Sequence, residues 1–347
     1  MTTSARRWAF SAPTVRFGTL EIVRFLVIFV FAFSLAAQVR FVPQNSGVTA
    51  SLRGLATVGE QTAWASGTGG TILLTTDGGA SWRRRPVPGA EALDFRDLAA
   101  FSERQAFALT SGEGEKSRIY KTTDGGASWQ LLKTNSDPKG FWDAIAFSDP
   151  KHGVLMGDSV NGRVVIETTT DGGVTWLRRK TPPALPGEGG FAASGTCLVV
   201  RGKREIWFGT VAARVFRSQN GGATWTVSET PLRQADPTAG IFSLAVGLRG
   251  ALLAVGGDYR KPEQATQVLS RSSDGGKSWI IGSGPRGFRS AAIFLNPKLV
   301  IAVGTSGADL SRDGGGTWEP VDAAGYNAIQ PGWAVGPEGR IARVIVQ

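Results

Sequence analysis

Asp143 and Asp158 are two acidic side chains whose type and spacing could support acid–base chemistry. Both fall in the third copy of a sequence repeat in which each copy is expected to form four strands. Asp143 lies near the start of the first, inner strand of that copy and Asp158 follows its second strand, so both point toward the same face. Two carboxylates in unequal environments can act as general acid and general base, as in the hydrolysis of glycosidic bonds. Glycoside hydrolysis is therefore one chemistry open to this chain.

The chain has one cysteine, Cys197, and one histidine, His152, among its 347 residues. This excludes an internal disulfide, a thiolate zinc cluster and a multi-histidine metal site, and a Ser-His-Asp triad would have to use His152. There is no glycine-rich strand-to-helix fingerprint, no CxxC pair and no haem-binding pattern, so we expect no cofactor. We interpret His152 as a solvated turn residue and Cys197 as a buried, unreactive thiol.

Residues 25–37 form an uncharged apolar run, FLVIFVFAFSLAA, preceded by basic residues. A basic flank, a short apolar stretch and small residues at Ser34 and Ala36 are typical of a secretory signal cleaved after Ala36. A retained membrane anchor is the alternative, although a spanning helix needs about 20 apolar residues. We expect residues 1–36 to be a signal peptide or anchor and residues 37–347 to be an exported, periplasmic or otherwise extracytoplasmic domain. Export argues against a nucleic-acid partner despite the net charge of +10.

An eight-residue box recurs six times, first as TTDGGASW from Thr75 and last as SRDGGGTW from Ser311. Its third residues are separated by 47, 47, 49, 54 and 39 positions. Periods of this length, with about four strands each, are typical of a β-propeller, in which one blade cannot bury both of its faces alone.

Each box predicts a tight turn between two strands. The carboxylate can accept backbone N–H groups of its own turn, the two glycines take up positive φ, and the flanking Ser or Thr adds local hydrogen bonds. The Trp then begins the outer strand, and six of the 11 tryptophans occupy this position. We therefore interpret the third residues of the boxes as structural: Asp77, Asp124, Asp171, Asn220, Asp274 and Asp313.

Seven second strands accompany the six boxes, and the seventh belongs to residues 326–347, which supply three strands and then stop. The segment that follows the leader, around residues 39–48, can provide the missing outer strand and close the ring. We therefore predict an all-β, seven-bladed β-propeller, with the N-terminal strand closing the last blade. A six-bladed ring with an unpaired tail is the alternative.

The boxes resemble the Asp-box (bacterial neuraminidase) repeat, which is specific for the fold and uninformative about activity. Beyond the boxes, the chain is similar to the photosystem II stability/assembly factor-like propellers and their bacterial relatives over nearly all of residues 48–347. This resemblance rests on GFWDAIAF from Gly140, LPGEGGFAASGT from Leu185, GGDYRKP from Gly256, AVGTSG from Ala302 and GWAVGPEGRIA from Gly332. It implies a non-catalytic, exported scaffold that helps a membrane protein complex to assemble.

Ligands of propellers bind where the loops before the inner strands meet the loops between the second and third strands, around the axis. The repeat places nine candidates at or near the starts of inner strands: Arg53, Arg96, Asp97, Trp142, Asp143, Ser194, Arg289, Tyr326 and Asn327. Six more fall on the other loops: Asp158, Asp258, Tyr259, Arg260, Lys261 and Ser306. These polar residues either form a recognition face or only make hydrogen bonds to the backbone of the tight loops that carry them.

A sialidase needs three arginines, a tyrosine nucleophile paired with a glutamate, and an aspartate. This chain has three tyrosines, of which Tyr120 lies on a third strand, and it lacks the accompanying Arg-Ile-Pro pattern. A sialidase-like or other glycoside hydrolase that uses the polar face is therefore our alternative. The main expectation is a monomeric, non-catalytic scaffold that binds a protein or peptide, such as a subunit of a membrane or envelope complex.

Two basic runs, at residues 83–85 and 178–180, fall on predicted outer strands. Arginine on an edge strand protects it against the addition of further strands. The functional alternative is a flank that docks an acidic protein segment or an anionic membrane surface, because guanidinium groups bind carboxylates in a bidentate way.

Overall fold

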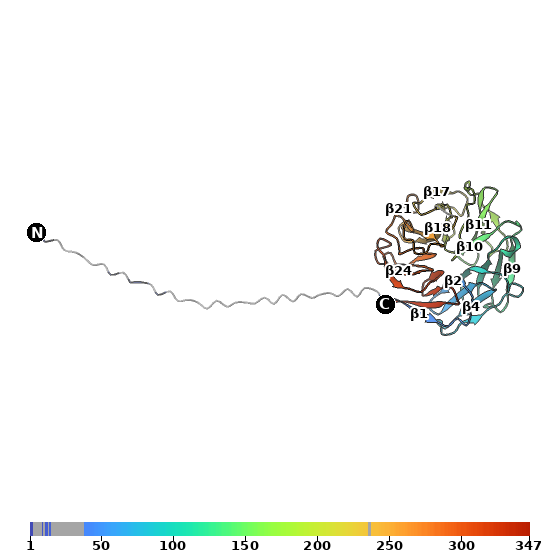
Figure 1. The fold of residues 1–347 in the computed structure, drawn as a ribbon, viewed down its shortest axis with the longest axis horizontal. Helices are drawn as coiled ribbons and strands as arrows, with labels where there is room; N and C mark the ends of the chain where they lie inside the picture. Colours follow the sequence, from blue (N-terminus) through green and yellow to red (C-terminus); the bar gives the residue numbers. More distant parts are fainter. Residues whose placement is uncertain (3–8, 10, 13, 15–37, 235–236) are drawn as a thin grey trace. The chain divides into compact units, whose positions relative to one another are not determined.

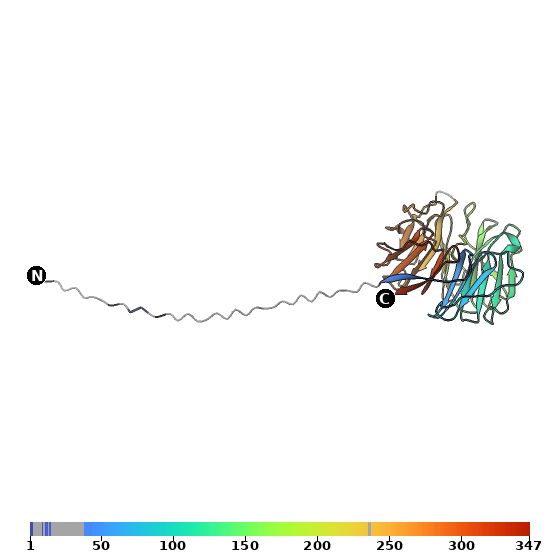
Figure 2. The ribbon, with the colours of Figure 1, turned by 60° about the horizontal axis from the view of Figure 1, so that its bottom comes forward.

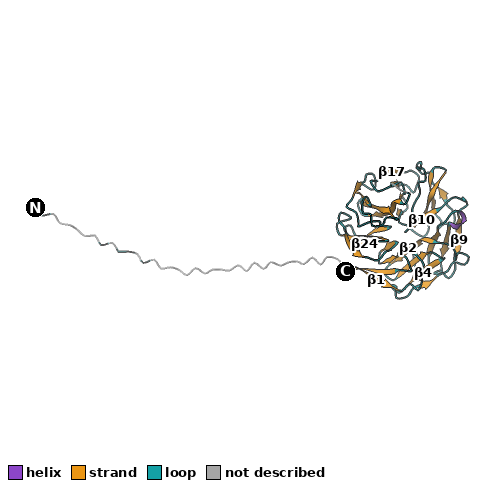
Figure 3. Cartoon of the chain, in the orientation of Figure 1, coloured by secondary structure: helices purple, strands orange, loops and turns teal. Residues whose placement is uncertain are grey.

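The computed structural model describes residues 1–2, 9, 11–12, 14, 38–234 and 237–347. Within them, 28 strands form seven four-stranded antiparallel sheets, which Figure 1 shows arranged as blades around a central axis. The described helix is one 3-10 turn, η1 (Gly114–Lys116), and strands dominate the view in Figure 3. The predicted seven-bladed, all-β fold is confirmed. The apolar run at 25–37, with the predicted cleavage site after Ala36, lies outside the described residues.

Each of the first six blades uses four consecutive strands, running from the axis outward. Blade 1 contains β2 (Leu52–Val58), β3 (Thr62–Gly67), β4 (Thr71–Thr75) and β5 (Arg83–Arg84). Blade 2 contains β6 (Phe95–Ala100), β7 (Ala106–Thr110), β8 (Arg118–Thr122) and β9 (Gln130–Thr134). Blade 3 contains β10 (Trp142–Phe147), β11 (Gly153–Val160), β12 (Arg163–Thr169) and β13 (Leu177–Arg178). Blade 4 contains β14 (Leu198–Arg201), β15 (Glu205–Gly209), β16 (Arg214–Ser218) and β17 (Thr226–Glu229). Blade 5 contains β18 (Ala239–Val246), β19 (Leu252–Asp258), β20 (Leu269–Ser272) and β21 (Ile280–Ile281). Blade 6 contains β22 (Ala291–Phe294), β23 (Val300–Gly304), β24 (Gly307–Ser311) and β25 (Glu319–Asp322).

The seventh blade joins the two ends of the ordered ring. Its strands are β26 (Ala328–Gln330), β27 (Trp333–Val335), β28 (Ile341–Val346) and, outermost, β1 (Val39–Gln44). β1 pairs with β28 along its whole length, from Val39 opposite Val346 to Gln44 opposite Ile341, and the two strands run side by side in Figure 2. The predicted closure of the last blade by the N-terminal strand is confirmed.

Apolar side chains fill the spaces between blades. Trp64 and Ile72 of blade 1 pack in one buried cluster with Phe95 and Ala108 of blade 2, and equivalent clusters lie at the other junctions. Because each sheet buries both faces only against its neighbours, hydrophobic burial stabilises the ring as a whole. None of the described helices is long and apolar enough to cross a membrane.

Short polar side chains tie neighbouring inner strands together near the axis. Asp97 of β6 accepts a hydrogen bond from the N–H of Ile145 in β10 at 2.8 Å, and Ser243 of β18 accepts one from the N–H of Ala292 in β22 at 3.1 Å. Asn327 Nδ2 donates to the carbonyl of Leu52 at 2.8 Å and links the last blade to the first. These bonds satisfy backbone groups that no sheet ladder reaches.

Candidate functional site

A β-bulge near the start of the inner strand aims one side chain per blade toward the axis in four of the blades. The register slips at Arg53 in blade 1, Arg96 in blade 2, Asp143 in blade 3 and Phe242 in blade 5. A bulged residue is left out of the ladder and its side chain is re-aimed, which is why bulges are frequent beside functional sites.

Three of these four side chains line a cavity of about 430 Å³ at the axial face. The wall continues through loops of blades 4 to 7, so residues far apart in sequence meet here. The lining residues are Arg53, Arg96, Phe191, Ala192, Ala193, Pro237, Phe242, Tyr259, Phe288, Ser290, Thr305 and Asn327. The volume is within the usual range for ligand pockets.

Two guanidinium groups give this axial cavity its positive charge. Arg96 donates from Nε to Asp94 Oδ2 at 2.8 Å and from Nη1 to the carbonyl of Ala192 at 3.2 Å. Nε of Arg53 is buried and has no hydrogen-bond partner among the described residues. Burial, and then the like charge of Arg96, lower the pKa of Arg53. A buried donor without a partner is costly, so the guanidinium of Arg53 is incompletely satisfied within the protein.

Aromatic rings form another part of the wall of the axial cavity. Phe191 stacks on Phe242 with ring centroids 3.6 Å apart and planes 11° apart. Phe288 meets Phe242 edge to face at 4.6 Å, and Tyr259, which is 45% exposed, meets it at 6.2 Å. The cavity therefore combines cationic donors with an apolar, aromatic surface.

In blade 3 a loop covers the bulged residue. Asp143 is 1% exposed, and its Oδ2 accepts a hydrogen bond from the N–H of Gly190 at 3.3 Å. Asp158, at a second bulge in β11, lies against Gly189 so closely that a Cβ there would clash with its carboxylate. The two aspartates that we considered for acid–base chemistry therefore lie together, but beneath the loop at 188–193 and not on the cavity wall. The same loop brings Phe191 to the cavity.

Of the 15 predicted face residues, Arg53, Arg96, Tyr259 and Asn327 line the axial cavity. Arg260 and Lys261 are exposed beside Tyr259, whereas Asp258 is buried and accepts from Thr238 Oγ1 at 2.8 Å. Asp97 and Ser194 lie deeper, along a second hollow of about 370 Å³ between the inner strands. Burial raises the pKa of Asp97 to about 7, against the hydrogen bonds from the N–H groups of Ile145 and Leu98.

The other predicted residues are part of the packed framework. Trp142 is 3% exposed and fills the junction between blades 2 and 3. Arg289 is fully buried, forms an ion pair with Asp309 and donates to Ser306 Oγ at 3.0 Å. Tyr326 is 2% exposed and packs on Phe41, and burial raises its pKa to about 12. Trp142 begins its inner strand, and Arg289 and Tyr326 lie two residues before theirs. None of the three lines the axial cavity.

The carboxylates of the boxes are satisfied within their own turns. Asp77 accepts from Thr75 Oγ1 at 2.8 Å, from the N–H of Ser81 at 3.0 Å and from Ser81 Oγ at 2.6 Å. These hydrogen bonds, those of Ser81 first, lower the pKa of Asp77. Asn220 makes the same turn, with Oδ1 accepting from the N–H of Thr224 at 2.9 Å and Nδ2 donating to its hydroxyl at 2.8 Å. Glycines at the fourth and fifth box positions have positive φ, as at Gly78 and Gly79.

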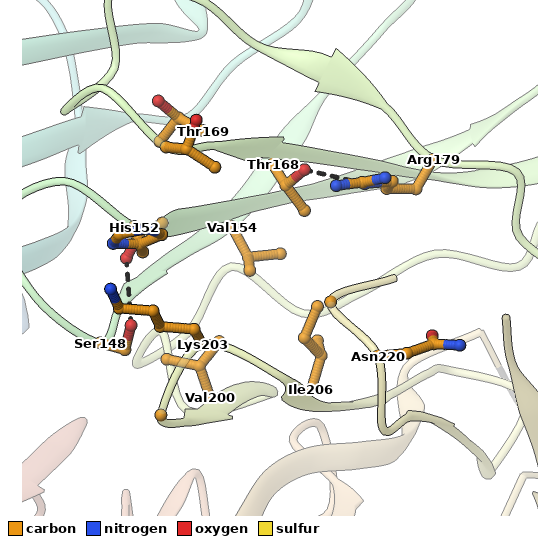
Figure 4. A pocket seen from close by; sticks show the side chains of 14 residues that line it. Ser148, His152, Val154, Thr168, Thr169, Arg179, Val200, Lys203, Ile206 and Asn220 are labelled. Atoms are coloured by element: carbon orange, nitrogen blue, oxygen red, sulfur yellow. Dashed lines mark hydrogen bonds between the residues drawn. The ribbon is translucent and has the colours of Figure 1, made fainter. Parts of the chain in front are cut away.

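A separate cavity of about 240 Å³ lies between blades 3 and 4, at the end of the blades that carries the box turns (Figure 4). His152 lines it, and its Nδ1 lies 2.9 Å from both carboxylate oxygens of Asp149. Arg179 lies farther along the wall and donates from Nε to Thr168 Oγ1 at 2.8 Å. Within the described residues, no group of three or more His, Cys, Asp or Glu side chains could hold a metal ion.

The aromatic half of the axial cavity was missed by the reading of the sequence. In the sequence, the phenylalanines at positions 191, 242 and 288 cannot be told apart from residues of the hydrophobic core. The predicted face was therefore built mainly from side chains with hydrogen-bonding groups. A signal was present: Phe242 precedes Ser243 just as Arg53 precedes Gly54 and Arg96 precedes Asp97, so all three occupy one repeat position.

No family model matches the chain, and no curated protein matches it. Among solved structures the fold has clear relatives. The chain is similar in fold to YCF48. A structure described as YCF48 bound to D1 peptide aligns with a TM-score of 0.62 at 16% identity, over 89% of this chain and 97% of that chain. The resemblance to assembly factor-like propellers is thus confirmed at the level of fold.

Two further solved structures belong to enzymes. A streptogramin B lyase aligns with a TM-score of 0.64 at 15% identity, over 89% of this chain and 98% of that chain. A GH74 enzyme from Niastella koreensis aligns with a TM-score of 0.54 at 16% identity, over 86% of this chain and 51% of that chain. Because the same fold serves peptide binding and catalysis, function must be argued from the site.

Proposed function

We propose that this chain is a non-catalytic, exported propeller that binds an acidic segment of a protein partner in the axial cavity. The observation that carries this proposal is the meeting of Arg53 and Arg96 with the stacked rings of Phe191 and Phe242 in one cavity. The partner segment would be an extended peptide of a membrane or envelope complex, and the protein would act as an assembly or stability factor. The YCF48 structure with its D1 peptide supports the same type of ligand for this fold.

The chemistry of the cavity matches a peptide that carries a carboxylate beside an apolar side chain. Arginine binds carboxylates through two parallel N–H donors, and hydrogen bonds to charged groups contribute about 1.5–3 kcal/mol each. The guanidinium group of the half-buried Arg53 lines the cavity and supplies donors for the carboxylate. Phe191, which is half-buried and stacked on the buried Phe242, provides an apolar surface for a neighbouring aromatic or aliphatic side chain.

The glycoside hydrolase alternative receives less support from the geometry. Asp143 is covered by the loop at 188–193, so its carboxylate does not reach the cavity where a sugar would bind. A tyrosine nucleophile is also not in reach, because Tyr120 and Tyr326 are buried and Tyr259 has no carboxylate partner on the cavity wall.

The test is an array of fluorescein-labelled peptides, each with one Glu or Asp beside one aromatic residue, and matched peptides with Gln or Asn. We expect wild-type protein to prefer the acidic members. The double variant Arg53→Gln/Arg96→Gln should bind about tenfold to a hundredfold more weakly, as expected for the loss of charge-assisted hydrogen bonds. The control is Arg83→Gln/Arg84→Gln, which removes the same charge from the exposed strand β5.

Equal binding of acidic and amide peptides, or equal loss in the control, would overturn the proposed site. Turnover of fluorogenic glycosides that Asp143→Asn abolishes would replace it with the hydrolase alternative. The export part of the proposal is checked separately, by N-terminal sequencing of protein from the envelope fraction, with Ala37 expected as the first residue if the leader is cleaved.

A further inference from the structure

We propose that Asp143 and Asp158 share one proton, and that this proton holds the loop at 188–193, and with it Phe191, in the position that completes the axial cavity. Ligand binding in the cavity would then weaken when the proton is lost. The inference deepens the proposed function, because it concerns regulation of the same site by pH.

The two carboxylates converge on one short piece of backbone. Asp143 Oδ2 accepts from the N–H of Gly190, and the carboxylate of Asp158 is also directed at this group and lies against Gly189. A Cβ at Gly190 would approach the carboxylate of Asp143 to 3.0 Å, so the backbone is in direct contact with both side chains. One N–H cannot satisfy two carboxylate groups, which leaves the pair short of donors unless one member is protonated.

Burial makes double ionisation costly. Desolvation, and then the charge of Asp158, raise the pKa of Asp143, and desolvation raises the pKa of Asp158 to about 6. Two like charges in such a site cannot both ionise without strong repulsion, and the protons are then lost in two steps that belong to the pair.

The charged groups around the pair do not neutralise it. Arg96, from β6, attracts Asp143 weakly from a distance and is itself bonded to Asp94. On the covering loop, Glu188 is paired with Arg214 of β16. From the blade 4 side, the Cys197 thiol is buried, and burial and then the charge of Asp143 raise its pKa, so it stays neutral.

The loop transmits the state of the pair to the cavity. Gly190 is followed directly by Phe191, which stacks on Phe242, and then by Ala192, whose carbonyl accepts from Arg96. When both carboxylates ionise, they repel each other directly beneath the loop that carries Phe191 and Ala192, and this repulsion displaces the loop. We therefore expect Phe191 to leave its stacked position and the cavity to lose its aromatic side.

The experiment compares peptide affinity at several pH values between about 5.5 and 8.5, where a ligand carboxylate stays ionised. The probe is the tightest fluorescein-labelled acidic peptide of the array. We expect wild-type affinity to fall about tenfold per pH unit once the pair ionises. In Asp158→Asn the amide is neutral at every pH and can donate to Asp143, so affinity should stay high and the profile flat. Glu103→Gln, at an exposed position of blade 2, is the matched control and should keep the wild-type slope.

A second measurement does not need a ligand. The carboxyl carbons of the aspartates, followed by NMR over the same range, should show one buried pair titrating above the ordinary range of aspartate, and Asp143→Asn should remove one of its two steps. If both carboxylates ionise below about pH 5, or if wild type and Asp158→Asn have the same pH slope, the inference is refuted. If wild type binds no peptide at any pH, the proposed function fails, and the carboxyl titration still decides whether the proton is shared.

Discussion

Gln44 offers the sharpest test of how the ring is closed. Its Nε2 donates to the carbonyl of Gly78 at 3.0 Å, and its Oε1 accepts from Trp82 Nε1 at 3.1 Å and from Trp333 Nε1 at 3.2 Å. One side chain of the closing strand β1 therefore binds both the box turn of blade 1 and the second strand of its own blade. In Gln44→Ala all three hydrogen bonds are lost, and the indole donors of the partly buried Trp82 and the fully buried Trp333 lose their partner.

At about 1 kcal/mol for each bond, the expected loss in the free energy of unfolding is about 3 kcal/mol. With an unfolding entropy of about 2.1 cal/mol/K per residue, this lowers the Tm of a unit of about 300 residues by about 5 °C. The assay is urea and thermal unfolding followed by tryptophan fluorescence. The control is Gln130→Ala, an exposed outer-strand position of blade 2. If Gln44→Ala loses no more stability than Gln130→Ala, the closure does not depend on this side chain and the reasoning is wrong.

Two more predictions concern residues that the structure places in the framework. In Arg289→Met the carboxylate of Asp309 stays buried, and among the described residues its remaining ion-pair partner is the half-exposed Arg286. The free energy of unfolding should therefore fall by about 3–5 kcal/mol, and the double variant Arg289→Met/Asp309→Leu should recover a large part of this loss in a urea titration. In the first box, Asp77→Asn should keep a Tm near that of wild type, because Asn220 already makes the same turn. Asp77→Ala should lower the Tm, because the hydrogen bonds of the carboxylate are lost. Equal Tm values for the two variants would show that these side-chain hydrogen bonds do not stabilise the turn.

The blades were predictable because their information is local and repeated. A box such as Thr75 to Trp82 contains the hydrogen-bond partners of its own aspartate, so the sequence of one copy explains how its turn is held. The closure was predictable by counting: three strands at the C-terminus needed a fourth, and β1 is the strand that supplies it.

The site was harder to predict because it depends on two features that the repeat does not encode. The first is the position of the bulges, which decides that Arg53 and Arg96 point to the axis while Arg289 turns inward to Asp309. The second is the long loop before blade 4, which covers Asp143 and substitutes Phe191 for it on the cavity wall. Neither a strand pattern nor a polar residue type distinguishes these outcomes.

The bulges also explain how one stable ring can carry varied chemistry. The residue at the bulge takes no part in the ladder, and the ties between inner strands are made by its neighbours, such as Asp97 beside Arg96 and Ser243 beside Phe242. Arginine, aspartate and phenylalanine therefore occupy equivalent positions in different blades at little cost to the sheets. It follows that exchanging Arg53 should change binding far more than stability, whereas exchanging Asp97 or Ser243 should do the reverse. Phe242 is 3% exposed, so its exchange should weaken both binding and stability.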